Sequence, residues 1–120
     1  MNVYTDGSKI DGNVGAGFVI YKHGSTIKEA GSKLPMSSSV FQAEIVAIRE
    51  AAKYLYEDYE DFKYVRFFVD SQAALLALNG TEITSDIVKE TVQALNKISK
   101  SRVVILNWTR AHIGLSLIHI

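Results

Sequence analysis

Three stretches near the start of the chain have the hydrophobic pattern of short β-strands separated by turn residues. They run over Asn2 to Asp6, Val14 to Lys22 and Thr26 to Leu34. The first is followed by Asp6-Gly7-Ser8, and the second by Lys22-His23-Gly24-Ser25, both of which have turn composition. This spacing predicts an antiparallel three-stranded meander.

The hydrophobic period then changes to that of a helix. Serines 37 to 39 offer N-caps, and the apolar residues that follow are separated by steps of four, three, four and three: Phe41, Ile45, Ile48, Ala52 and Leu55. This spacing predicts a helix of about five turns with one apolar face.

The second half of the chain carries two further strands and two further helices. Tyr64 to Val69 is almost wholly apolar, as in a strand inside a sheet, and Arg102 to Trp108 forms the last strand. Between them lie a short helix over Ser71 to Leu78 and a longer one capped by Ser85 or Thr84. Strand–helix–strand crossovers imply parallel pairing, so we expect an α/β fold with a five-stranded mixed sheet and helices packed on it.

Length and composition indicate one domain over residues 1–120. The 120 residues include 13 basic and 13 acidic side chains and no cysteine. No apolar run approaches the roughly 20 residues of a membrane span, and no signal peptide is visible. The lack of cysteine fits a reducing compartment, so we expect an intracellular, cytoplasmic protein. Balanced charge argues against tight non-specific binding to nucleic acid, so such a partner has to be inferred from a site.

Two aspartates fall at predicted strand ends. Asp6 ends the first strand and Asp70 ends the fourth, where ligands gather in open α/β sheets. Each also has a purely structural interpretation: Asp6 can form an Asx turn before Gly7, and Asp70 can cap the helix that begins at Ser71.

Glu44 lies inside the apolar arc of the first predicted helix. A glutamate on such a face costs several kcal/mol unless it is paired, and no lysine or arginine occupies a neighbouring inward position. The alternatives are a bound cation, an open site at the helix end, or a side chain that snorkels out. Three converging carboxylates favour a divalent cation, and oxygen ligands favour Mg²⁺ or Mn²⁺.

Four motifs in order resemble those of type 1 ribonuclease H: Thr5-Asp6-Gly7-Ser8, Phe41-Gln42-Ala43-Glu44, Phe67-Phe68-Val69-Asp70-Ser71 and Trp108-Thr109-Arg110-Ala111-His112-Ile113-Gly114. The resemblance runs from Asn2 to Leu115. It implies a ribonuclease H-like fold and an endonuclease that hydrolyses the RNA strand of RNA/DNA hybrids with two Mg²⁺ or Mn²⁺ ions.

The resemblance also implies roles for individual residues. Asp6, Glu44 and Asp70 would be catalytic metal ligands, with Asp6 bridging the two ions. His112 would assist as a catalytic loop residue, although its position also suits an ordinary exposed loop residue. The substrate would be bound by Gly7, Ser8, Gln42 and Ser71, with Gln42 at the position that contacts 2′-hydroxyls. By their spacing Tyr64, Phe67, Phe68 and Trp108 are core residues, with base stacking as the alternative for Trp108.

The chain departs from the family pattern after Gly114. It reads Leu115-Ser116-Leu117-Ile118-His119-Ile120, without the family's C-terminal helix, and no acidic residue follows Glu90. We therefore expect the fourth carboxylate ligand of the family to be missing and one ion site to be weakened. His119 or the α-carboxylate of Ile120 could substitute.

This departure leaves more than one function open. We expect a ribonuclease H with impaired or altered activity. The alternative is a catalytically inactive nucleic-acid-binding or structural module of the same fold. A different nuclease or transposase domain is disfavoured by Gln42 and His112. The apolar tail, residues 115–120, is expected to pack on its own chain or to form a homodimer.

Overall fold

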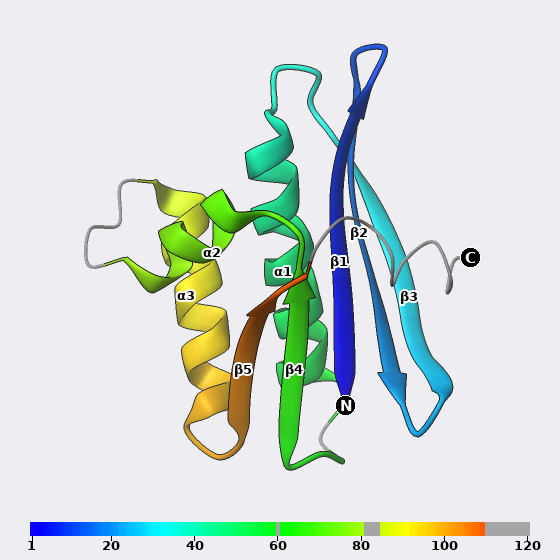
Figure 1. Ribbon diagram of the computed structural model, residues 1–120, viewed down its shortest axis with the longest axis vertical. Helices are drawn as coiled ribbons and strands as arrows, with labels where there is room; N and C mark the ends of the chain where they lie inside the picture. Colours follow the sequence, from blue (N-terminus) through cyan, green and yellow to red (C-terminus); the bar gives the residue numbers. More distant parts are fainter. Residues whose placement is uncertain (60, 81–84, 110–120) are drawn as a thin grey trace.

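The computed structural model describes residues 1–59, 61–80 and 85–109, which form a five-stranded sheet with three helices (Figure 1). The elements are β1 (Asn2–Ile10), β2 (Asn13–Lys22), β3 (Ser25–Leu34), α1 (Val40–Glu57), β4 (Tyr64–Val69), α2 (Gln72–Asn79), α3 (Asp86–Ser99) and β5 (Val103–Trp108). The strand order is β3-β2-β1-β4-β5, with an antiparallel β1–β2–β3 meander and β4 and β5 parallel to β1. The predicted mixed sheet is confirmed. Within the described residues, no helix has the length and hydrophobicity to cross a membrane.

The first strand is longer than its sequence pattern predicts. β1 continues through Asp6-Gly7-Ser8 and pairs with β2 as far as Ile10. The chain turns instead at Asp11-Gly12, whose φ angles of 51° and 80° are left-handed. The predicted turn at Asp6 is wrong because the hydrogen bonds to β2 override the local turn preference. Asp6 therefore lies within a strand.

The main hydrophobic core lies between the sheet and the helices. Figure 1 shows α1 behind the sheet and α3 alongside it. The largest fully buried apolar side chains of this core are Val3, Ile20, Ile45, Ile48, Leu55, Val65, Phe67, Val69 and Ile98. Each contributes roughly 1.5–3 kcal/mol by leaving water. This core fixes α1 against β1, which positions the site described below.

Two aromatic residues predicted to be core are exposed. Tyr64 is 52% exposed and Trp108 46% exposed, whereas Phe67 is buried and Phe68 half-buried. For Tyr64 the cause is the alternation of β4, in which Val65, Phe67 and Val69 face the core and the residues between them face the other side of the sheet. Trp108 is the last residue of β5, a strand at the edge of the sheet. An apolar run hides this alternation, because both faces are made of similar residues.

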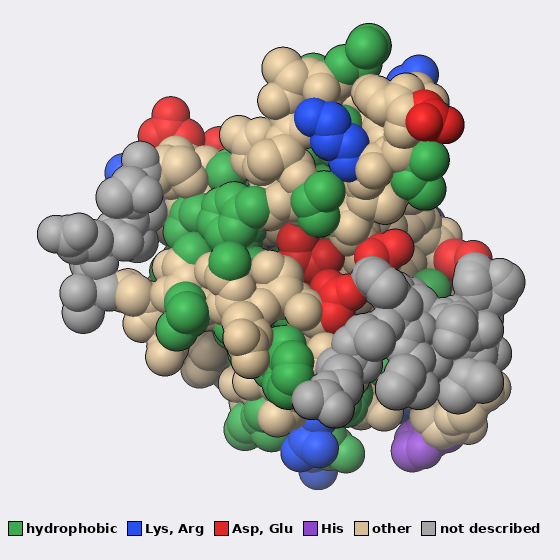
Figure 2. Space-filling view, turned by 45° about the horizontal axis from the view of Figure 1, so that its top comes forward, with side chains coloured by type: hydrophobic (Ala, Val, Ile, Leu, Met, Phe, Trp, Pro, Cys, Tyr) green, Lys and Arg blue, Asp and Glu red, His purple; other side chains and the backbone are tan. Residues whose placement is uncertain are grey.

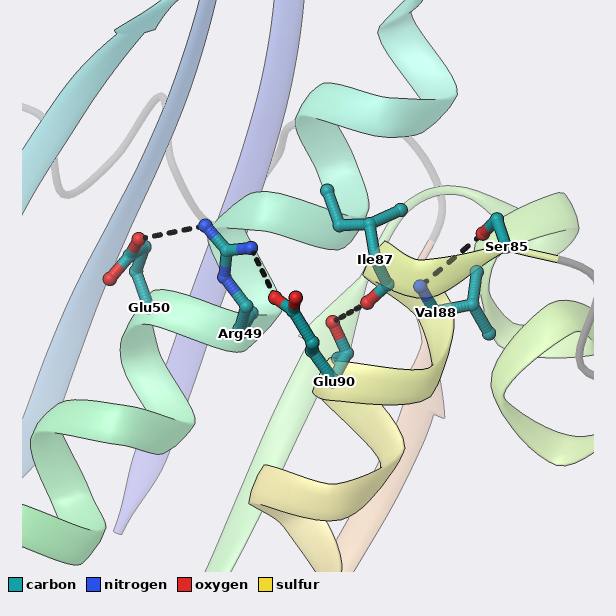
Figure 3. A network of polar contacts seen from close by, with 7 residues as sticks. Arg49, Glu50, Ser85, Ile87, Val88 and Glu90 are labelled. Atoms are coloured by element: carbon teal, nitrogen blue, oxygen red, sulfur yellow. Dashed lines mark hydrogen bonds and ion pairs between the residues drawn. The ribbon is translucent and has the colours of Figure 1, made fainter.

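Figure 3 shows the polar contacts that connect α1 to α3 and cap the N-terminus of α3. Arg49 of α1 donates to Glu90 of α3 at 2.9 Å, and the Ser85 hydroxyl accepts the Val88 N–H as the helix N-cap. Glu90 is more than half exposed, so the ion pair contributes about 1 kcal/mol or less. Apolar packing is therefore the main attachment between the two helices.

The backbones of β1 and α1 approach closely at Gly7. A Cβ atom at this position would lie 2.5 Å from the Glu44 nitrogen and 2.9 Å from the Val40 oxygen. These are backbone atoms of α1, so they cannot move aside without moving the helix. Gly7 thus sets the distance between the strand that carries Asp6 and the helix that carries Glu44.

The close approach at Gly7 predicts that adding one methyl group there destabilises the fold. Gly7→Ala should lower the free energy of unfolding by roughly 1–3 kcal/mol, the usual cost of overpacking. Urea unfolding followed by circular dichroism measures it. Gly31→Ala is the matched control, because its Cβ would meet only the Ala16 oxygen at 3.6 Å, an ordinary contact. Equal losses in the two variants would contradict the packing role of Gly7.

Candidate metal centre

The site forms where β1 and β4 stop running side by side. Their parallel pairing ends at Tyr4 and Phe68, while β1 continues with β2 alone. Asp6 lies two residues beyond this last pair, and Asp70 follows β4. In an open α/β sheet, the carboxyl ends of the strands border such a crevice. The two aspartates are thereby brought to the same end of the sheet.

Glu44 reaches this crevice from α1. Its side chain is 1% exposed, which confirms its predicted place on the apolar face and excludes the alternative that it snorkels into solvent. The Thr5 hydroxyl donates a hydrogen bond to Glu44 Oε1 at 2.7 Å, and the Gly7 backbone N–H also donates to this carboxylate. Both donors come from β1, so the strand fixes the direction of the glutamate side chain.

The three predicted carboxylates converge. Asp6, Glu44 and Asp70 each offer an oxygen, and these atoms lie within 4.8 Å of one another. Figure 2 shows acidic side chains gathered near the middle of one face of the molecule. The structural alternatives are wrong: Asp6 is inside a strand rather than a turn, and Ser71, not Asp70, caps α2.

Burial and like charge raise the pKa of Glu44. Desolvation is the largest cause, and the charges of Asp70 and Asp6 add to it. The hydrogen bonds from Thr5 and Gly7 act in the opposite direction because they stabilise the ionised form. The result is a pKa of about 7 rather than 4.5, so the cluster holds a proton readily when no cation balances it.

Asp70 is held by the neighbouring strand. The Trp108 indole N–H donates to the backbone oxygen of Asp70 at 3.2 Å, and the Thr109 N–H donates to the Val69 oxygen at 2.9 Å. Sequence reasoning missed this role of Trp108. It also missed Thr5, although a polar residue two positions after the inward-facing Val3 was a visible signal.

The structure gives local contacts for the residues predicted to bind substrate. Gln42 forms a capping box with Ser39, accepting the Ser39 N–H at 2.8 Å, and Ser71 accepts the Ala74 N–H. Ser8 and Asp6 line a shallow pocket of about 680 Å³ together with Gly15 and Gly17. Position 7 requires a glycine because a Cβ atom there would clash with the backbone of α1. Their contacts with substrate stay predictions, and His112, His119 and the tail lie outside the described residues.

Solved structures of ribonucleases share this fold. The chain is 19% identical to RNase H1 of the halophilic archaeon Halobacterium salinarum, with a TM-score of 0.73 over 94% of this chain and 87% of that one. LC11-RNase H1, solved in complex with an RNA/DNA hybrid, is 20% identical, with a TM-score of 0.74 over 96% and 88%. The N-terminal RNase H domain of a Mycobacterium tuberculosis protein, solved as a fusion with maltose-binding protein, is 16% identical, with a TM-score of 0.75 over 95% and 91%.

Comparison at the sequence level identifies the family. No curated protein sequence matches the chain. The family model for RNase H, in contrast, matches residues 1–117, nearly the whole length. This match covers all three carboxylates of the cluster as well as the strands and helix that carry them. The chain belongs to the RNase H family.

Proposed function

We propose that this protein is a metal-dependent endoribonuclease that hydrolyses the RNA strand of RNA/DNA hybrids. The observation that carries the proposal is the convergence of Asp6, Glu44 and Asp70 in a chain of the RNase H family. The substrate class is supported by the similar LC11-RNase H1, which was crystallised with an RNA/DNA hybrid.

The donor set fits a hard divalent cation. Asp6, Glu44 and Asp70 offer only oxygen atoms, the ligands that Mg²⁺ and Mn²⁺ prefer. Three carboxylates this close repel one another, and the raised pKa of Glu44 reflects first its burial and then that repulsion. When bound there, such cations lower the pKa of water and stabilise negative charge on the leaving oxygen.

The other residues around the cluster suit recognition of RNA. Gln42 uses its side-chain oxygen in the capping box, so its NH₂ group is the end available to donate to a 2′-hydroxyl or a base. We assign Gly7, Ser8 and Ser71 to the RNA backbone and His112 to a supporting role beside the reaction. No protein nucleophile is needed, in agreement with the absence of cysteine from the sequence.

Among the described residues, the cluster contains three carboxylates, those of Asp6, Glu44 and Asp70. Three carboxylates can hold one cation well and a second one weakly. We therefore expect activity to require more metal than in relatives with four carboxylates, and Mn²⁺ to exceed Mg²⁺ because it tolerates imperfect ligand sets. Hybrid binding without cleavage would instead favour the inactive-module alternative.

Cleavage of a labelled hybrid tests the proposal. The protein should cut the RNA strand with Mn²⁺ or Mg²⁺ and leave duplex RNA and duplex DNA intact. Asp70→Asn should reduce the rate at least about 100-fold, because a lost ligand removes several kcal/mol of charge stabilisation. Gel electrophoresis of the 5′-labelled RNA strand gives the rates.

The control for this experiment is the same substitution at a distant aspartate. Asp61 is exposed and paired with Lys22 at 3.2 Å, so Asp61→Asn should leave cleavage unchanged. Unaltered cleavage by D70N would remove the site assignment. The absence of cleavage with either metal would refute the proposed activity.

The raised pKa of Glu44 predicts how stability depends on pH. Since its pKa is about 7 when folded and 4.5 ordinarily, the folded chain binds more protons between these values. The stabilisation is complete below pH 4.5 and is lost as pH rises through 7. Its size is on the order of 3 kcal/mol, because each tenfold change in proton affinity corresponds to about 1.4 kcal/mol.

Urea unfolding at pH 5 and pH 8 in the presence of a chelator measures this effect. Glu44→Gln should flatten the dependence and stabilise the metal-free protein at pH 8. Glu57→Gln, at an exposed glutamate of the same helix, should not change it. Equal pH dependence in E44Q and the unaltered protein would show that Glu44 is not the responsible group.

A further inference from the structure

Among the described residues, three polar or charged side chains are buried: Thr5, Glu44 and Thr91. Thr5 is 2% exposed and lies on β1 directly before Asp6. Its hydroxyl donates to Glu44, a residue 39 positions away and on another element. The polar group of Thr5 is therefore buried against a proposed metal ligand.

We propose that Thr5 is a positioning residue for the metal centre, whose hydroxyl holds the Glu44 carboxylate in the direction of Asp6 and Asp70. The inference rests on the proposed function, because it assumes that these carboxylates bind a divalent cation. It adds a residue that contributes to cation binding without touching the cation.

The geometry of β1 supports this role. Side chains alternate along a strand, so Thr5 and Gly7 face α1 while Asp6 between them faces away. The Thr5 hydroxyl and the Gly7 N–H both donate to the carboxylate of Glu44. One short stretch of backbone therefore carries one ligand and orients the second.

The chemistry of Thr5 indicates that the function of its hydroxyl is to hydrogen-bond Glu44. A valine would fill the same space and suit a buried strand position equally well. A buried hydroxyl costs free energy unless it is hydrogen-bonded, and the 2.7 Å distance is typical of a strong bond to a carboxylate. A glutamate without this bond would sample more side-chain rotamers, and the other ligands would have to align it when a cation binds.

Thr91 offers a matched comparison. It is also fully buried, but its hydroxyl donates to the Ile87 backbone oxygen at 2.8 Å, within the same helix. This bond satisfies the hydroxyl locally and involves no carboxylate. Removing the Thr91 hydroxyl therefore removes one buried hydrogen bond, as removing the Thr5 hydroxyl does, but leaves the carboxylate cluster unchanged.

Calorimetric titration of the metal-free protein with MnCl₂ or MgCl₂ tests the inference without nucleic acid. Thr5→Val should weaken binding by about 10-fold or more, the usual effect of losing a group that orients a metal ligand. Thr5→Ser should bind within about threefold of the unaltered protein, because it keeps the donor, and Thr91→Val should bind normally. In hybrid cleavage, T5V should raise the metal requirement and leave the KM for the hybrid unchanged.

A second pair keeps the test decisive if T5V does not fold. Thr5→Ser and Thr5→Ala both lose the methyl group and differ only in the hydroxyl, so T5S should bind the metal about 10-fold more tightly than T5A. Equal affinities within this pair, or T5V binding as tightly as the unaltered protein, would overturn the inference and leave the proposed function standing. No metal binding by the unaltered protein would overturn both. Binding that depends on Thr5 without hybrid cleavage would support the inference and refute the proposed activity.

Discussion

The arrangement of the site depends on the buried carboxylate of Glu44 and on the two donors that β1 gives it. A carboxylate that is 1% exposed loses most of its hydration, which costs several kcal/mol unless other groups replace it. Thr5 and Gly7 replace part of it, and the nearby aspartates add repulsion. The balance leaves a group that a divalent cation would stabilise in its ionised form. The same contact also requires a glycine, since the backbones of β1 and α1 approach too closely for a Cβ atom.

Sheet topology brings the other two carboxylates to this contact. β1 pairs with β4 only near its start, so the strands separate where Asp6 and Asp70 emerge. The helices pack on one face, which lets α1 reach across the end of the opening with Glu44. The apolar core therefore does more than stabilise the fold, because it sets the separation of three mutually repelling groups. The Trp108 indole, bonded to the Asp70 carbonyl, extends this support to the last strand.

Solved RNase H structures show how far the amino-acid sequence can vary within this fold. Solved structures with 16–20% identity have TM-scores of 0.73 to 0.75 with this chain. Most core positions need only an apolar side chain of suitable volume, so their identity can vary widely. Carboxylates that bind a hard cation, as proposed here, would tolerate less variation, because such a cation requires oxygen donors at fixed separations. Family membership is shown by a match over residues 1–117, whereas the proposed activity would depend on a few atoms at one end of the sheet.

The sequence alone determined the order of the elements, because each hydrophobic period depends only on neighbouring residues. It also singled out Glu44, since a charge inside an apolar arc stands out without knowledge of its partners. The tertiary structure decided what depends on distant residues: β1 runs through Asp6-Gly7-Ser8 because β2 pairs with it, and Trp108 is exposed where the edge strand β5 ends. The hydrogen bond from Thr5 to Glu44 joins residues 39 positions apart, and position 7 requires a glycine because the backbone of α1 lies against it. A local pattern shows that a polar group is buried, but only the packed elements show which group satisfies it.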